Sequence, residues 1–176
     1  MDNNTAQTGL VHIYTGDGKG KTTAAIGLAL RAAGQGLNTV IIQFLKGDSE
    51  CGEHVFASRF RPFEIVQFTK GNCFNLPDEQ LLEDVNEAIG YAREVTRSGE
   101  YQIVVLDEIF VAIDRGLLNT SAVVDLIRGK HEHTELVLTG RDAPPEIIDH
   151  ADYLTEMKLH KHPFLKGVTA RKGIEY

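Results

Sequence analysis

The sequence of 176 residues contains no tryptophan and only two cysteines, Cys51 and Cys73. Two thiols are too few for a secreted fold held together by disulfides, so a reducing compartment is expected. No apolar run approaches the roughly 20 residues that cross a bilayer, and the polar residues 1–8 lack the apolar core of a secretory signal. We therefore expect a cytoplasmic protein with no membrane partner.

Positive charge is scarce overall, with a formal net charge of −7. This balance argues against broad binding to nucleic acid. Residues 158–172, however, contain five Lys or Arg residues and no Asp or Glu. The stretch is either a solvated tail or a basic edge of a site for an anionic ligand. The length fits one domain, which we place at residues 10–176 behind a flexible tail at residues 1–9.

Short apolar runs alternate with helical patterns along the chain. Strands are predicted at residues 10–15, 39–45, 64–68, 101–106, 135–139 and 153–159, and helices at 22–35, 77–98, 121–128 and from 144. This alternation indicates an α/β fold with a mostly parallel sheet and helices on both faces. Ligands of such sheets bind at the carboxyl ends of the strands.

The strongest motif is TGDGKGKTT at residues 15–23, between the first strand and the first helix. A glycine-rich turn in this place lets backbone N–H groups surround phosphates. Lys21 would add a charge, and the Thr22 hydroxyl would hold Mg²⁺. The first glycine lies one residue nearer the Gly-Lys pair than in the usual pattern. The predicted ATP-binding residues are Gly16, Asp17, Gly18, Lys19, Gly20, Lys21, Thr22 and Thr23.

Three further motifs follow predicted strands or loops. Asp107 and Glu108 end a buried strand, where acids bind Mg²⁺ directly or through water, or else cap the next helix. Arg141 follows another strand and could contact phosphate or form a surface ion pair. Cys51-Gly52-Glu53-His54 lacks the remaining ligands of a zinc site, so we expect a mobile loop there.

Several segments together resemble ATP:corrinoid adenosyltransferases of cobalamin biosynthesis and salvage. They are TGDGKGKTTAAIGLALRAAGQG, VIIQFLKG, VVLDE, LTGRDAPPEIIDHADYLTEMK and KHPFLKGVTARKGIEY. The resemblance covers residues 10–176 and implies a RecA-like P-loop fold, a homodimer and Mg²⁺ as cofactor. It also implies that ATP gives its 5′-deoxyadenosyl group to the cobalt(I) of a reduced corrinoid, releasing triphosphate. Lys21, Glu108 and Arg141 would be catalytic. Thr22 and Glu108 would bind the metal, and Asp107 would support these ligands without binding the metal itself.

The resemblance also concerns the corrinoid, which could be cobalamin, cobinamide or cobyrinic acid diamide. Enterobacterial members carry a Phe-x-Trp pair beneath the corrin ring. Here Phe68 matches, Lys70 stands at the Trp position, and Phe74 is a candidate replacement. A reductase or flavodoxin would supply electrons. Two other functions stay open on the residues alone: an ordinary P-loop NTPase or small-molecule kinase, and a nucleotide-gated module that binds a corrinoid without turnover.

Overall fold

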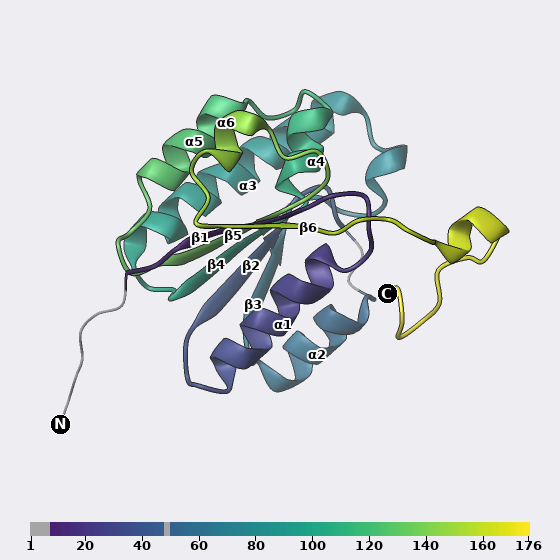
Figure 1. Cartoon of the computed structure of the whole chain (residues 1–176), viewed down its shortest axis with the longest axis horizontal. Coiled ribbons are helices and arrows are strands. Elements are labelled where there is room, and N and C mark those ends of the chain that lie inside the picture. The colour runs from purple at the N-terminus through teal and green to yellow at the C-terminus, as the bar shows by residue number, and fades with distance from the viewer. Residues whose placement is uncertain (1–7, 48–49) are drawn as a thin grey trace.

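The computed structural model describes residues 8–47 and 50–176. Its sheet is six-stranded and parallel, with the order β3-β2-β4-β5-β1-β6 (Figure 1). The strands are β1 Val11–Thr15, β2 Thr39–Gln43, β3 Glu64–Gln67, β4 Ile103–Asp107, β5 Glu135–Thr139 and β6 Tyr153–Glu156. The helices are α1 Lys21–Ala33, α2 Gly52–Phe60, α3 Asp78–Ser98, α4 Ile109–Asp114, α5 Thr120–Arg128 and α6 Pro145–Ile148. The predicted α/β class and parallel sheet are confirmed.

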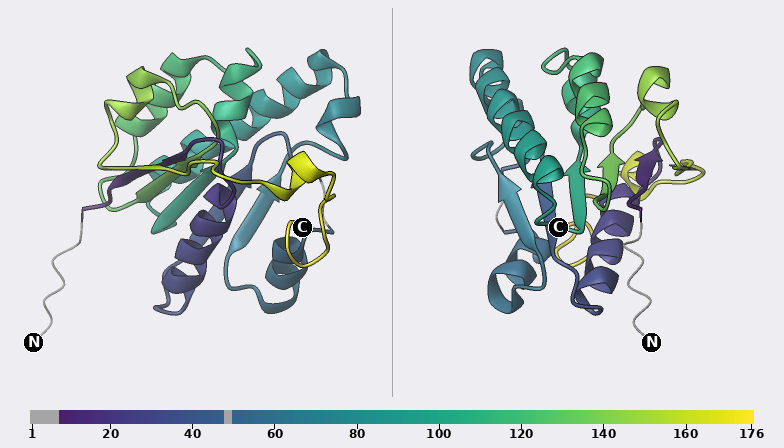
Figure 2. Two further views of the ribbon diagram at one scale, coloured as in Figure 1. Left: turned by 45° about the vertical axis from the view of Figure 1, so that its right-hand side comes forward. Right: turned by 90° about the vertical axis from the view of Figure 1, so that its left-hand side faces the viewer.

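Helices cover both faces of the sheet, with α1 and α2 on one face and α3 to α6 on the other (Figures 1 and 2). Alternate residues of one strand serve the two cores. Val40 and Ile42 pack with the α3–α6 side, whereas Ile41 packs with the α1–α2 side. Because both sides of the central strands are buried, β2 and β4 are apolar almost throughout.

The carboxyl ends of the central strands place polar side chains together. Gln43 ends β2 and pairs in register with Asp107, which ends β4. Thr139 ends β5, the next strand of the sheet. All three residues are buried. The phosphate loop leaves β1 at the same edge, so the sheet brings the predicted motifs to one place.

Two expectations need correction. Residues 51–54 are not a loop: Cys51 precedes α2, and Gly52 begins that helix. The rings of Phe56 and Phe60 lie 5.0 Å apart on α2, and Ala57 is buried in the core, so packing stabilises a helix that the polar CGEH start concealed. The last strand also ends at Glu156, three residues before the predicted end.

Residues 1–7 of the predicted tail lie outside the described residues. Gly9, also assigned to that tail, donates its N–H to the carbonyl oxygen of Glu132 at 2.8 Å. In the described part of the chain, the helices are too short or too polar to span a bilayer.

Candidate active site

The phosphate loop has the tight backbone that its glycines predict. Gly16 and Gly20 have φ angles of 97° and 121°, which other residues rarely adopt. A Cβ atom on Gly16 would lie 2.5 Å from the carbonyl oxygen of Met157, just beyond β6. The loop therefore depends on glycine both for its conformation and for its packing against the segment after β6.

Lys21 is folded into the phosphate loop. It is only 8% exposed, and its Nζ donates to the carbonyl oxygens of Gly16 at 2.6 Å and Gly18 at 3.0 Å. Burial lowers the pKa of Lys21, although the charge of Glu108 opposes that shift. The ammonium is thus held where a phosphate group bound by the loop would meet it.

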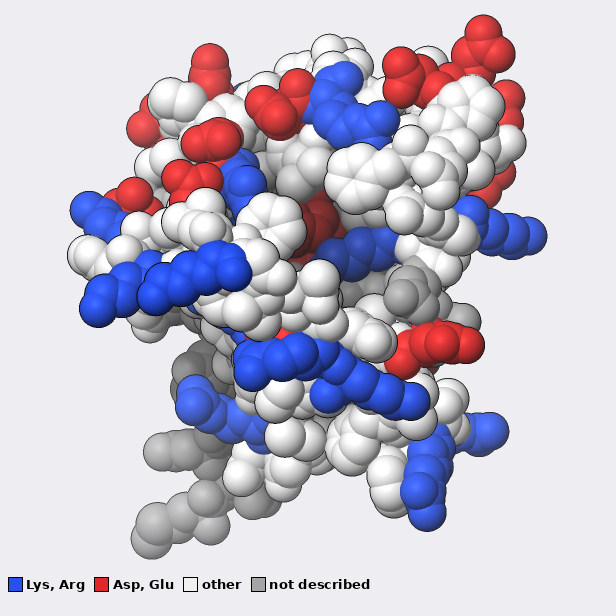
Figure 3. Space-filling model, turned by 90° about the vertical axis from the view of Figure 1, so that its right-hand side faces the viewer, with Lys and Arg blue, Asp and Glu red and all other residues white. Residues whose placement is uncertain are grey.

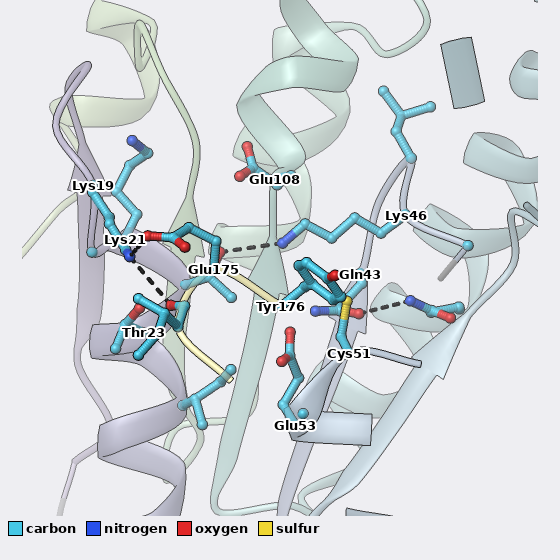
Figure 4. A pocket seen from close by; sticks show the side chains of 18 of the residues that line it. Lys19, Lys21, Thr23, Gln43, Lys46, Cys51, Glu53, Glu108, Glu175 and Tyr176 are labelled. Atoms are coloured by element: carbon cyan, nitrogen blue, oxygen red, sulfur yellow. Dashed lines mark hydrogen bonds and ion pairs between the residues drawn. The ribbon is translucent and has the colours of Figure 1, made fainter. Parts of the chain in front are cut away.

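A cavity of about 1090 Å³ opens beside this loop. Figure 3 shows the face that it hollows, with acidic and basic side chains inside the hollow. Lys21 and Lys46 reach into the cavity from opposite sides, with Glu108 above them and Glu175 between (Figure 4). The predicted residues that line it are Asp17, Gly18, Lys19, Gly20, Lys21, Thr22, Thr23, Glu108 and Arg141. The sequence-predicted phosphate and metal groups therefore meet at one site.

Asp107 is the centre of the polar cluster and has no exposed surface. Its Oδ1 accepts hydrogen bonds from the hydroxyls of Thr22 at 2.8 Å and Thr139 at 2.7 Å. Its Oδ2 accepts from Gln43 Nε2 at 3.2 Å and from Lys46 Nζ at 2.7 Å. Four donors thus compensate for removing one carboxylate from water.

Gln43 is held in place by its own partners. Its Oε1 accepts a hydrogen bond from Gln67 Nε2 at 2.9 Å and lies 2.8 Å from His54 Nε2. These contacts orient the amide so that its nitrogen faces Asp107. The sequence motif contained Gln43 and Lys46, but their roles were not predicted. The available signal was a polar residue ending an otherwise apolar, buried strand.

Glu108 has a conformation suited to the cavity rather than to helix capping. It precedes α4 with a left-handed φ of 62°, and its side chain makes no capping bond to that described helix. Its backbone N–H donates to Thr139 Oγ1 at 2.9 Å. Burial raises the pKa of Glu108, while the charge of Lys46 lowers it in part. The side chain is available to a ligand in the cavity.

The two residues predicted to contact a corrinoid do not line this cavity. Phe68 is half-buried and packs on Tyr91 of α3, with ring centroids 5.9 Å apart. Lys70 is exposed and also lies outside the lining. Phe74 does line the cavity and is 86% exposed. The structure therefore brings Phe74, rather than the matched Phe68, to the site.

The C-terminal residues lie against the phosphate loop, because the basic stretch turns back after β6 (Figure 2). Lys19 Nζ lies 2.9 Å from Glu175 Oε1 and donates to the carbonyl oxygen of Ile174 at 3.2 Å. Hydrogen bonds from Arg171 and Lys19 lower the pKa of Glu175 to about 2. The carboxylate of Glu175 thus pairs with Lys19 at the wall of the cavity.

Comparisons with known proteins find a matching family and similar sequences. The family described as ATP:corrinoid adenosyltransferase BtuR/CobO/CobP matches residues 7–176. A corrinoid adenosyltransferase of Pseudomonas aeruginosa is 34% identical over 173 residues, covering 97% of this chain and 85% of that protein. Corrinoid adenosyltransferase CobA of Salmonella typhimurium is 30% identical over 173 residues, covering 97% and 87%.

One solved structure shares the fold. A KaiC-like protein of Pyrococcus horikoshii superposes with a TM-score of 0.58 at 17% identity, covering 88% of this chain and 75% of that one. This likeness concerns the architecture alone. Together with the phosphate loop and the parallel sheet, it confirms the RecA-like P-loop fold.

Proposed function

Because the chain belongs to the ATP:corrinoid adenosyltransferase family, we propose that it transfers the 5′-deoxyadenosyl group of ATP to the cobalt(I) of a reduced corrinoid. The observation that carries this proposal is that the phosphate loop and the exposed Phe74 line one shared cavity. Its volume of about 1090 Å³ slightly exceeds the roughly 300–1,000 Å³ of ordinary ligand pockets. The space suits a nucleotide together with part of a second substrate.

The reaction asks for positioning and charge compensation. Cobalt(I) attacks C5′ of the ribose, a cobalt–carbon bond forms, and the carbon–oxygen bond breaks with its electron pair leaving on triphosphate. Cobalt(I) is itself a strong nucleophile, so no base is needed. Lys21 and Arg141 would hold the departing phosphates, and the loop N–H groups would fix the nucleotide for in-line attack.

Mg²⁺ fits the oxygen donors that α1 and the residue after β4 supply. The Thr22 hydroxyl and the Glu108 carboxylate are hard oxygen ligands of the kind Mg²⁺ takes. Asp107 accepts from the Thr22 hydroxyl and would orient it. The ammonium of Lys46 already lies among these groups, which supports a preference for a cation there. When bound, Mg²⁺ would neutralise charge on the triphosphate.

An ordinary NTPase or kinase is the second candidate. The observation in its favour is Glu108, whose raised pKa and place in the cavity would suit a group that polarises an attacking water or hydroxyl. The nucleotide product separates the two functions: adenosyl transfer gives triphosphate, whereas an NTPase or a kinase gives ADP.

The test is anaerobic incubation with MgATP and chemically reduced cobalamin, followed by chromatography of the phosphate products. We expect triphosphate in equal amount to the alkylated corrinoid, and none without corrinoid. Lys21→Ala should abolish both products while the protein stays folded. ADP formed without corrinoid at a comparable rate would contradict the proposal.

Two properties of the family extend the proposal. We expect a homodimer, which light scattering of the purified protein checks. We also expect cobalt(II) substrates to need a separate reductase or flavodoxin as electron donor, so MgATP and cobalt(II)alamin alone should give no product.

A further inference from the structure

Lys46 occupies the space in which the metal is expected. Its Nζ lies 2.7 Å from Asp107 Oδ2 and 3.2 Å from Thr22 Oγ1. We propose that Lys46 is a stand-in cation that excludes Mg²⁺ from the nucleotide-free site and gives way when Mg²⁺ arrives with ATP. This inference rests on the metal position proposed above and adds a residue that makes metal binding conditional on nucleotide.

The buried carboxylate of Asp107 needs a positive charge beside it. Asp107 is completely buried, and a buried carboxylate without a cation is costly even when neutral groups donate to it. The charges of Glu108 and Glu53 add to the negative potential around the ammonium. Among the described hydrogen bonds to Asp107, the one from Lys46 comes from a charged donor. Lys46 therefore neutralises the cluster in the absence of ligands.

A metal ion and the ammonium of Lys46 would compete for the same space. A dication bound to Thr22 would lie within a few ångströms of Lys46 Nζ, where like charges repel strongly in a partly buried site. The protein also offers few ligands: within residues 8–47 and 50–176, no group of three His, Cys, Asp or Glu side chains converges as a metal site. Phosphate oxygens of ATP would supply what the protein lacks.

Lys46 can leave without dismantling the cluster. It follows β2, and its side chain is 32% exposed, so the ammonium has a path to water. Gln43, by contrast, is 1% exposed and fixed by Gln67. After Lys46 moves, Asp107 keeps its bonds from Gln43 and from the two threonines. The site therefore combines a Lys46 side chain that can move away with an Asp107 carboxylate that stays in place.

The experiment measures Mn²⁺ binding by electron paramagnetic resonance, with and without ATP, in the absence of corrinoid. Lys46→Met removes the charge and the donor, whereas Lys46→Gln keeps a donor for Asp107 and so protects folding. Lys166→Met is the matched control, because it removes one positive charge from a residue outside the cavity lining. Melting temperatures measured with and without Mg²⁺ give a second readout that is independent of electron paramagnetic resonance.

Without ATP, both Lys46 variants should bind Mn²⁺ about tenfold tighter or more than the wild type and the control, a change of about 1.4 kcal/mol. Mg²⁺ alone should raise their melting temperatures but not that of the wild type. ATP should tighten Mn²⁺ binding much more in the wild type than in the variants. If Lys46→Met does not fold, the Mn²⁺ affinity of Lys46→Gln alone tests the proposal.

Two other outcomes are distinguishable. If ATP tightens Mn²⁺ binding in all four proteins but the Lys46 variants match the wild type without ATP, the stand-in role is overturned and the proposed metal site stands. If ATP tightens Mn²⁺ binding in none of them, the proposed metal position is wrong, and the inference falls with it.

Discussion

Replacing Asp107 by Asn tests how much the buried cluster contributes to stability. The carboxylate accepts four hydrogen bonds, whereas an asparagine amide offers one oxygen and brings an NH₂ group that faces existing donors. A buried donor such as the Gln43 amide would lose its partner, at a cost of about 1–3 kcal/mol. Loss of the ion pair with Lys46, which is partly exposed, adds about 1 kcal/mol at most. We expect Asp107→Asn to lower the free energy of unfolding by about 1–4 kcal/mol.

Urea denaturation of the nucleotide-free protein at neutral pH measures this loss. Asp78→Asn is the control, because its carboxylate is 87% exposed and 3.3 Å from Arg115, and should cost under about 1 kcal/mol. Lys46→Met should cost less in the Asp107→Asn background than in the wild type, since the two residues are in contact. Equal losses for Asp107→Asn and Asp78→Asn would refute the view that the four hydrogen bonds stabilise the fold.

Three further predictions concern ligands. Because burial lowers the pKa of Lys21, ATP affinity measured by calorimetric titration should fall as the pH rises toward 10.5, the usual pKa of lysine. Lys21→Arg stays charged and should show no such fall. We propose that Phe74 keeps a lower axial ligand off cobalt(II), so Phe74→Ala should slow adenosylation from cobalt(II)alamin, with a reductant present, more than from pre-reduced cobalt(I). Phe68→Ala should mainly lower the melting temperature. Equal slowing of both assays by Phe74→Ala would contradict this role of Phe74. Glu175→Gln should tighten ATP binding by freeing Lys19, and unchanged affinity in equilibrium dialysis would show that Glu175 does not compete with phosphate.

Local sequence signals were enough for the phosphate loop and most of the sheet. Gly16 and Gly20 stand where positive φ angles are required, and Lys21 follows at the start of a helix. The buried strands could be predicted because their apolar residues face a core on each side of the sheet and do not alternate with polar residues. These features depend on neighbours in the chain, so the sequence alone predicted them.

The contacts between distant segments could not be predicted in the same way. Lys46 reaches Asp107 because β2 and β4 are neighbours in the sheet. The sequences of these two strands do not reveal that they are neighbours. The return of Glu175 to Lys19 likewise joins residues 156 positions apart. The predicted corrinoid contacts of Phe68 and Lys70 came from a motif match and stay predictions, while the structure directs attention to Phe74.

The most direct test of the proposed reaction follows the carbon that is transferred. The protein is incubated anaerobically with Mg²⁺, pre-reduced cobalamin and ATP carrying ¹³C at C5′, and the corrinoid is examined by ¹³C NMR before and after exposure to light. The account predicts one labelled carbon bound to cobalt for each triphosphate released, with the cobalt–carbon signal lost on illumination. Label that stays in ADP or ATP, with an unalkylated corrinoid, would contradict adenosyl transfer.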